Sequence, residues 1–151
     1  MESAFKIWQK NRSIYLDYIT TKNLEQLNKI PDGFSNNIIW NIGHIVMVQQ
    51  SMVYKAAGLP MYISDDFFKT YKPGSKPTEL TTLTEVEELK KLLITTIEQT
   101  KLDFNLKKFT TFYEFTTRTG FHIGSTMEAI DFNNFHEGIH LGCIMNISKF
   151  V

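Results

Sequence analysis

The chain has 151 residues, of which 16 are lysine or arginine and 16 are aspartate or glutamate, so its formal net charge is zero. This balance lacks the basic field that binding to a phosphate backbone needs, which excludes nucleic acid as the expected partner. A hydrophobic content of 42% with 21% charged residues argues against disorder, and the single cysteine cannot form an internal disulfide.

These quantities predict one cytoplasmic domain over residues 1–151, because chains of this length usually bury a single core. No run of residues approaches the roughly 18 consecutive apolar residues of a membrane span, and the N-terminus lacks the apolar stretch of a signal peptide. We therefore expect no membrane partner.

Hydrophobic spacing predicts a first helix from Glu2 to about Leu27, and Pro31-Asp32-Gly33 separates it from the next helix because this sequence favours a turn. A second helix is expected to start between Ser35 and Asn37, whose side chains can cap free backbone N–H groups, and to continue to about Ala57. Gly58-Leu59-Pro60 provides its end, with glycine just past the helix and proline after it.

Residues 58–82 are punctuated by proline and glycine, which predicts a long connection. Such a length is unusual inside a small domain, so the segment is either functional or spans the molecule from end to end. Its aromatic side chains either cover a site or pack beneath the connection; they are Tyr62, Phe67, Phe68 and Tyr71.

A third helix is predicted from the capping box Thr84-Glu85-Val86-Glu87 to about Leu102. Residues 103–124 carry β-branched and aromatic residues that suit a short hairpin or a structured loop, and we treat them as irregular. A second capping box, Ser125-Thr126-Met127-Glu128, begins a last helix that runs to about Lys149. Four helices with two long connections predict an all-α four-helix bundle with long crossover connections of the up-up-down-down type.

Two histidines lie four residues apart in His136-Glu137-Gly138-Ile139-His140, on the predicted last helix. Four residues turn a helix by about 400°, so both imidazoles project from one face and can bind one divalent metal ion. The pentapeptide also matches the H-E-x-x-H pattern of zinc proteases. A protease is disfavoured because only 11 residues follow His140 and none of them is acidic.

The third ligand is expected to come from His44, midway along the predicted second helix, where an apolar face points into the bundle. Three imidazoles leave the fourth position of a tetrahedral zinc ion open for water or substrate, and nickel also suits these ligands. The alternative is that these histidines are hydrogen-bonded core or surface residues without a metal. His122 falls in the irregular segment and has no predicted role.

Several neighbours of the histidines have alternative interpretations. Glu137 either orients or deprotonates a metal-bound water or lies outside the chemistry as a solvent-facing or supporting carboxylate. Cys143 shares the histidine face and is either a fourth ligand or a small core residue. Asn41 either fixes an imidazole through a hydrogen bond, caps the backbone or is simply exposed. Gly138 and Gly142 would let another helix approach closely, within the chain or across a dimer.

Three segments together resemble the DinB-like (DinB/YfiT) superfamily, and the resemblance covers nearly the whole chain. They are Ile30-Pro31-Asp32-Gly33-Phe34, Trp40-Asn41-Ile42-Gly43-His44-Ile45 and His136-Glu137-Gly138-Ile139-His140-Leu141-Gly142. The chain is particularly similar to the branch whose crossover contains Phe67-Phe68 and Lys72-Pro73-Gly74-Ser75-Lys76-Pro77. The resemblance implies a four-helix bundle, often dimeric, with a metal site formed by His44, His136 and His140, usually occupied by zinc or nickel.

The activities that the resemblance implies are thiol S-transfer from low-molecular-weight thiols such as bacillithiol or mycothiol, mycothiol-dependent isomerisation, and hydrolysis. We therefore expect a homodimeric, metal-dependent enzyme that activates a thiol or a water molecule toward a small-molecule substrate. The alternative is a dimerisation module that binds a metal ion or a small molecule without turnover.

Overall fold

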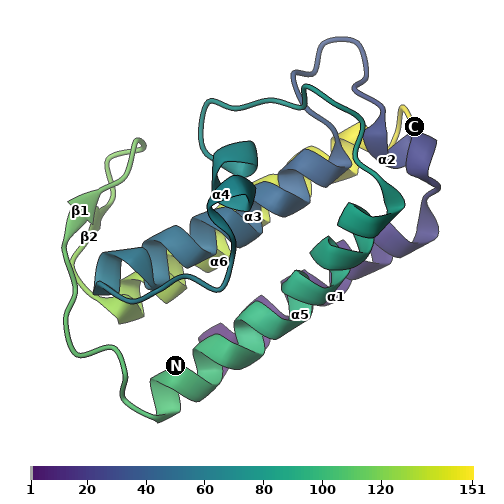
Figure 1. Cartoon of the computed structure of the whole chain (residues 1–151). Coiled ribbons are helices and arrows are strands. Elements are labelled where there is room, and N and C mark those ends of the chain that lie inside the picture. The colour runs from purple at the N-terminus through teal and green to yellow at the C-terminus, as the bar shows by residue number, and fades with distance from the viewer. Residues whose placement is uncertain (1) are drawn as a thin grey trace.

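The computed structural model describes residues 2–151 and is mostly helical, which confirms the all-α class (Figure 1). In chain order the elements are α1 (Glu2–Thr21), α2 (Leu24–Asn28), α3 (Ile38–Val53), the short 3₁₀ helix η1 (Lys55–Ala57), α4 (Asp65–Tyr71), α5 (Leu83–Asn105), β1 (Phe115–Thr116), β2 (His122–Ile123) and α6 (Thr126–Ile147). The two strands form one antiparallel pair.

The long helices α1, α3, α5 and α6 pack around a common hydrophobic core, with α3 against α5 and α6 and with α1 against the same two helices. Figure 1 shows that α1 and α6 run in one direction and that α3 and α5 run in the opposite one. These directions differ from the predicted up-up-down-down arrangement. The turn at residues 31–33 reverses the chain before α3, and only the connection between α3 and α5 crosses the length of the molecule.

The predicted first helix is in fact two helices. α1 ends at Thr21, and Asn23 begins α2 by accepting a hydrogen bond from the backbone N–H of Gln26, whose side chain accepts one from the backbone N–H of Asn23. This reciprocal cap stabilises a new helix start. It interrupts a hydrophobic spacing that continues to Leu27, so periodicity alone indicates one helix instead of two.

α3 is buried on all sides, and Ser51 is its one residue that is only half-buried. Its first turn is capped by Asn37, whose side chain accepts a hydrogen bond from the backbone N–H of Trp40, in agreement with the predicted start. After η1, Gly58 adopts a left-handed conformation with φ of 70°, which explains the glycine at this end. Within residues 2–151 no helix, α3 included, is long and apolar enough to cross a membrane.

The predicted connection over residues 58–82 contains an additional helix, α4, that hydrophobic spacing does not predict. Ser64 caps it by accepting a hydrogen bond from the backbone N–H of Phe67, and Asp65 and Asp66 lie in its first turn, where negative charge is favourable. α4 packs against α3. Its seven residues are too few to give a periodic hydrophobic signal.

α5 begins two residues earlier than predicted, because Thr82 and not Thr84 forms the capping box. The side chain of Thr82 accepts a hydrogen bond from the backbone N–H of Glu85, and the Glu85 carboxylate accepts one from the backbone N–H of Thr82. Both threonines precede a glutamate by three residues, so the sequence offers two equivalent starts.

The segment over residues 103–124, predicted to be irregular, contains the hairpin of β1 and β2, one of the alternatives that its composition suggests. α6 then begins after Ser125, as predicted, because the Ser125 side chain accepts a hydrogen bond from the backbone N–H of Glu128. The Glu128 carboxylate accepts its own hydrogen bond from the backbone N–H of Gly124 and not from that of Ser125.

Candidate metal centre

The three predicted ligands lie together between α3 and α6. Their candidate ligand nitrogens, from His44 on α3 and from His136 and His140 on α6, all lie within 4.8 Å of one another. The centroids of the three rings are 4.6 to 5.4 Å apart. Within residues 2–151, these side chains form the one group of histidine, cysteine and carboxylate residues whose ligand atoms are close enough to hold a metal ion.

The ring of His44 is held by a backbone carbonyl and by an aromatic neighbour. Its Nδ1 lies 2.7 Å from the carbonyl oxygen of Tyr71, and because a carbonyl only accepts, Nδ1 carries the proton and Nε2 keeps a free lone pair. The indole of Trp40 stacks on the imidazole with centroids 4.7 Å apart. Burial lowers the pKa of His44, although the hydrogen bond to Tyr71 acts in the opposite direction, and the ring is therefore neutral at pH 7.

The ring of His140 is held by Asn41, which reaches across from α3 to α6. Nδ1 of His140 lies 2.8 Å from Oδ1 of Asn41. The amide nitrogen of Asn41 donates to the carbonyl oxygen of Asn37 at 2.7 Å, so the amide oxygen is the atom that faces the imidazole. Nδ1 of His140 is consequently the donor and Nε2 is free. Of the predicted alternatives for Asn41, fixing an imidazole agrees with these contacts, and exposure is wrong because the side chain is buried between α3 and α6.

His136 contributes a polar atom that no described residue satisfies. Its Nδ1 is buried and has no hydrogen-bond partner among residues 2–151. Burial, followed by the charge of His44, lowers the pKa of His136 to about 4. Burial, followed by the charges of His136 and His44, lowers the pKa of His140 to about 3. A buried polar nitrogen without a partner costs free energy, and a ligand bound at this atom would remove that cost.

These features fit a divalent transition-metal ion. Neutral imidazole is the form that coordinates metals, and the low pKa values keep all three rings in that form at pH 7. Hydrogen bonds to the ring nitrogen opposite the ligand atom are typical of metal-binding histidines, and His44 and His140 both have one. Three nitrogen donors also leave one position of a tetrahedral ion open.

Glu137, the weak candidate for a catalytic residue, lies on the face of α6 that meets α1 and is fully buried there. Its carboxylate forms an ion pair with the buried Arg12 at 2.8 Å and accepts hydrogen bonds from Trp8 and Asn133, each at 2.8 Å. Its backbone carbonyl accepts a hydrogen bond from the hydroxyl of Tyr15. These contacts fasten α6 to α1. The expectation of a solvent-facing carboxylate is wrong, because packing of α6 against α1 buries Glu137 completely, and the contacts agree with a supporting role.

The remaining predicted neighbours do not join the histidines. Cys143 is half-buried and lies outside the group formed by the three imidazoles. A Cβ atom at Gly138 or Gly142 would meet no atom of residues 2–151 within 4 Å, so no other helix of the described chain approaches α6 there. His122 is exposed on β2, with its Nε2 3.6 Å from a carboxylate oxygen of Glu114, which agrees with its place outside the site.

The crossover, residues 58–82, supplies a contact to His44 that sequence reasoning did not predict. α4 brings the carbonyl oxygen of Tyr71 to His44, and it packs so closely on α3 that a Cβ at Gly43 would lie 2.3 Å from the ring of Tyr71. Both Tyr71 and Phe67 are buried. The signal in the sequence was the glycine directly before His44, since a missing side chain permits a close neighbour.

A sequence model described as the DinB superfamily matches residues 7–144 of the chain. The matched span begins within α1, ends within α6 and includes all three histidines. Among curated proteins, no sequence matches this chain.

Proposed function

The chain belongs to the DinB superfamily, and from this membership we propose that its four long helices form a bundle that holds a divalent metal ion, zinc or nickel, on His44, His136 and His140. The observation that carries the proposal is the geometry of the three imidazoles, whose candidate ligand nitrogens lie within 4.8 Å of one another. The buried and unpartnered Nδ1 of His136 supports it, because the described residues leave that atom unsatisfied.

We propose further that the protein is an enzyme acting on a small-molecule substrate, with a low-molecular-weight thiol or water as the nucleophile. A bound divalent ion supplies Lewis-acid chemistry, because it lowers the pKa of a thiol or water at its open position. In thiol transfer, the thiol proton passes to solvent, a carbon–sulfur bond forms at the electrophilic carbon, and the leaving group departs with its electron pair.

The residues of the chain prepare the site for this chemistry. Tyr71 and Asn41 hold the protons of His44 and His140 on Nδ1, so that Nε2 of each ring is free to bind. Trp40 covers one face of His44 and excludes water from it. The buried ion pair of Arg12 and Glu137 fastens α6, which carries two of the three rings, to α1.

The second candidate is a metal- or small-molecule-binding dimerisation module without turnover. The contacts of Glu137 with Arg12, Trp8 and Asn133 favour it, because the carboxylate that directly follows His136 in the sequence is committed to a structural network. Thiol-dependent conversion of an electrophile by the metal-loaded protein separates the two candidates.

Metal content tests the shared premise of both candidates. Protein purified without a histidine tag is expected to contain about one zinc or nickel ion per chain by elemental analysis. His140→Ala is expected to lose the metal, whereas His122→Ala removes an exposed histidine outside the site and is expected to retain it. Equal metal contents in the two variants would contradict the proposal.

The other expectations about partners and location remain predictions. Composition and the family resemblance suggest a cytoplasmic homodimer that binds neither nucleic acid nor membrane. Sedimentation velocity of the untagged protein tests the homodimer, and titration with duplex DNA at several salt concentrations tests the absence of nucleic-acid binding.

A further inference from the structure

A pocket of about 230 Å³ opens between α1 and α5. Its floor is formed by buried side chains, Arg12 from α1 and Leu93 and Ile97 from α5. Ser13 and Glu98 are exposed at its rim. None of the three histidines lines this pocket, so an occupant would need no metal ion.

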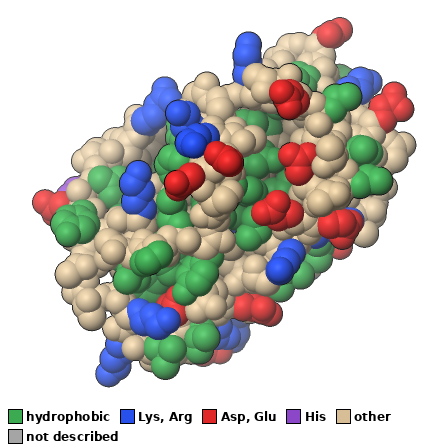
Figure 2. Space-filling model, viewed as in Figure 1, with side chains coloured by type: hydrophobic (Ala, Val, Ile, Leu, Met, Phe, Trp, Pro, Cys, Tyr) green, Lys and Arg blue, Asp and Glu red, His purple; other side chains and the backbone are tan. Residues whose placement is uncertain are grey.

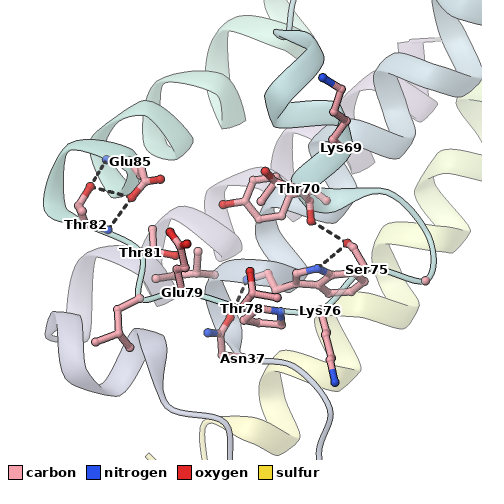
Figure 3. A pocket seen from close by; sticks show the side chains of 16 residues that line it. Asn37, Lys69, Thr70, Ser75, Lys76, Thr78, Glu79, Thr81, Thr82 and Glu85 are labelled. Carbon is pink, nitrogen blue, oxygen red and sulfur yellow. Dashed lines mark hydrogen bonds between the residues drawn. The ribbon is translucent and has the colours of Figure 1, made fainter.

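A larger pocket, of about 570 Å³, lies between the crossover, the start of α3 and the start of α5 (Figure 3). Polar side chains of its lining hydrogen-bond to one another, since the indole of Trp40 donates to the hydroxyl of Ser75, and Thr82 and Glu85 cap α5. Among residues 2–151, no residue that lines the larger pocket has a buried polar side-chain atom without a hydrogen-bond partner. The pocket between α1 and α5 differs, because Arg12 has such an atom.

One nitrogen of the Arg12 guanidinium is free. Arg12 is 3% exposed, and its Nη1 is buried without a hydrogen-bond partner among residues 2–151. The other two nitrogens bind Glu137 on α6, since Nε donates to its carboxylate at 3.0 Å and Nη2 at 2.8 Å. Because the guanidinium is planar and rigid, turning the edge with Nε and Nη2 toward α6 turns Nη1 away from that helix. Nη1 is therefore the polar atom that Arg12 leaves for an occupant of the pocket.

This nitrogen determines which kind of atom the occupant presents. A guanidinium donates hydrogen bonds and accepts none, so the occupant needs an acceptor such as an oxygen atom. A buried donor without an acceptor costs free energy, and a bound oxygen would remove that cost. The hydrogen bond would also be stronger than one between neutral groups, because Arg12 is charged.

The charges around the pocket favour an uncharged occupant. The charge of Arg12 is already balanced by Glu137, its buried partner. Glu98, the other ionisable residue that the described chain contributes to the lining, repels an anion at the rim. An ammonium group lacks the acceptor that Nη1 needs. On the face that carries α5, acidic and basic side chains are interspersed with hydrophobic ones, so the nearby surface favours neither sign (Figure 2).

Much of the remaining lining is aliphatic. Leu16 and Ile94 add to the surface of Leu93 and Ile97. Ile94 is 45% exposed, so an occupant would cover apolar surface that now contacts water. The volume is below the roughly 300–1,000 Å³ of pockets for drug-sized ligands, which suits a smaller molecule with a short alkyl chain.

We propose that the pocket between α1 and α5 binds a small, uncharged aliphatic carbonyl compound, whose oxygen accepts a hydrogen bond from Nη1 of Arg12. The alkyl chain lies against Leu16, Ile94 and Ile97. The polar group is held at the floor by the guanidinium, and the pocket excludes charged head groups on the same chain.

Titration of ¹⁵N-labelled protein with hexanamide, followed by two-dimensional NMR, tests the proposal. Hexanamide is expected to shift the amide signals of residues 9–16 and 93–98 saturably, with a Kd of about 1 mM or below. Hexanoate and hexylammonium carry an anionic and a donor-only head group on a similar chain. Each is expected to bind at least about threefold more weakly than hexanamide.

Variants at exposed positions locate the binding site. Ser13→Tyr places a ring at the rim of the pocket and is expected to weaken hexanamide binding at least about tenfold. Lys10→Tyr is the matched control, because Lys10 is exposed on α1 and does not line the pocket, and it is expected to bind hexanamide as the wild type does. Arg12→Lys retains a positive charge beside Glu137 but lacks Nη1, and it is expected to reduce the preference for hexanamide over hexylammonium at least about threefold.

The proposal is overturned if hexanamide binding does not saturate below about 10 mM, if hexanoate or hexylammonium binds as tightly, or if Ser13→Tyr binds hexanamide like Lys10→Tyr. These outcomes can be read even if Arg12→Lys does not fold, because the two tyrosine variants change exposed positions. Failure here leaves the metal analysis of His140→Ala unaffected, so the two proposals can fail separately.

Discussion

At the scale of single residues, two of the three imidazoles are held by groups that are not themselves candidate ligands. The carbonyl oxygen of Tyr71 and the amide oxygen of Asn41 each accept a hydrogen bond from Nδ1 of a histidine. This fixes the tautomer, so that Nε2 of His44 and of His140 presents a lone pair. The two supporting groups come from α4 and α3, and neither could be paired with its histidine from sequence spacing.

Replacing Asn41 tests this support. Asn41→Ala removes the acceptor of His140 Nδ1, so the affinity for zinc is expected to fall about 10- to 100-fold. Competition with a metal-binding dye measures the affinity. Asn146→Ala removes an exposed asparagine of α6 and is expected to bind zinc as tightly as the wild type. An unchanged affinity in Asn41→Ala would show that this hydrogen bond does not support the site.

The ion pair of Arg12 and Glu137 is the most deeply buried charged contact beside the site. Both side chains are almost completely excluded from solvent, with 3% and 0% exposure. Such a pair does not necessarily stabilise a fold more than apolar residues would, but removing one partner leaves the other charged and buried. The loss of stability caused by removing one partner can therefore be measured separately from any loss of activity.

Glu137→Gln is expected to lower the free energy of unfolding by about 3–5 kcal/mol, because Arg12 loses its counter-charge in a buried position. Urea denaturation followed by circular dichroism measures this change. If the variant remains folded at low temperature, its zinc affinity is expected to stay within a few-fold of the wild type, since the carboxylate contacts Arg12, Trp8 and Asn133. A loss of activity at unchanged stability would instead assign Glu137 to the chemistry.

At the scale of elements, the position of α4 on α3 links the crossover to the metal centre. The ring of Tyr71 occupies the space that a side chain at residue 43 would need, and the Tyr71 carbonyl then reaches His44. Gly43 is thus required by a close approach between two elements. At Gly138, on α6, an added Cβ atom would meet no atom of residues 2–151 within 4 Å.

These two glycines predict opposite effects of alanine. Gly43→Ala is expected to destabilise the protein by about 1–3 kcal/mol, because the new Cβ overlaps the Tyr71 ring, and to weaken zinc binding by displacing α4. Gly138→Ala is expected to stabilise it by up to about 1 kcal/mol, because alanine favours a helix more than glycine does. Denaturation midpoints of the two variants measure the contrast. Equal shifts in the two midpoints would rule out the packing explanation.

The C-terminal end of α5 is fastened to α3 and to the crossover by Asp103. Its carboxylate accepts hydrogen bonds from Tyr54 and Tyr62 and pairs with Lys108 at 2.7 Å. Burial alone would raise the pKa of Asp103, but hydrogen bonds from Lys108, Tyr54, Gln99 and Tyr62 outweigh it and lower the pKa. The ionised carboxylate therefore stabilises the folded state.

This lowered pKa makes stability depend on pH. A carboxyl group with a lower pKa in the folded state contributes its full stabilisation above its unfolded pKa of about 3.9 and loses it as the pH falls through the folded value. The difference in Tm between the wild type and Asp103→Asn is therefore expected to be constant from about pH 5 to 8 and to shrink below about pH 4. Thermal melts across this range measure the difference, with Asp32→Asn as an exposed control. A difference that is the same at all pH values would refute the assignment.

At the scale of the whole molecule, the candidate metal centre joins two helices that are far apart in the sequence. α3 and α6 run antiparallel, and their contact brings His44 to His136 and His140. A metal ion bound there cross-links the second and the last of the long helices. Its binding free energy is consequently added to the stability of the folded chain.

Metal binding is therefore expected to raise the Tm. At a free metal concentration about a thousandfold above the Kd, the stabilisation is about 4 kcal/mol, which corresponds to about 8–16 °C for a chain of this size. Differential scanning calorimetry with added zinc and with a chelator measures the shift. The shift is expected to vanish in His44→Ala and to persist in His122→Ala; a shift of the same size in both variants would place metal binding elsewhere.

Local rules account for most of the helical elements that the sequence predicted. Asn37, Ser125 and Gly58 occupy the caps that their chemistry favours, and the all-α class is a consequence of these signals. The same rules gave wrong helix boundaries where the sequence offers more than one possible helix start. Asn23 divides the first helix, and Thr82 caps α5 in place of Thr84, because two adjacent motifs satisfied the same capping rule.

By itself the sequence determined the helical class and the three histidines, because helix caps and an i, i+4 pair are local patterns fixed by backbone geometry. Only the tertiary structure decided the directions of the long helices, the Tyr71 and Asn41 contacts, and the burial of Glu137 against Arg12. These features depend on which elements meet across the core, and free energies of packing and burial between distant segments are not encoded in local spacing.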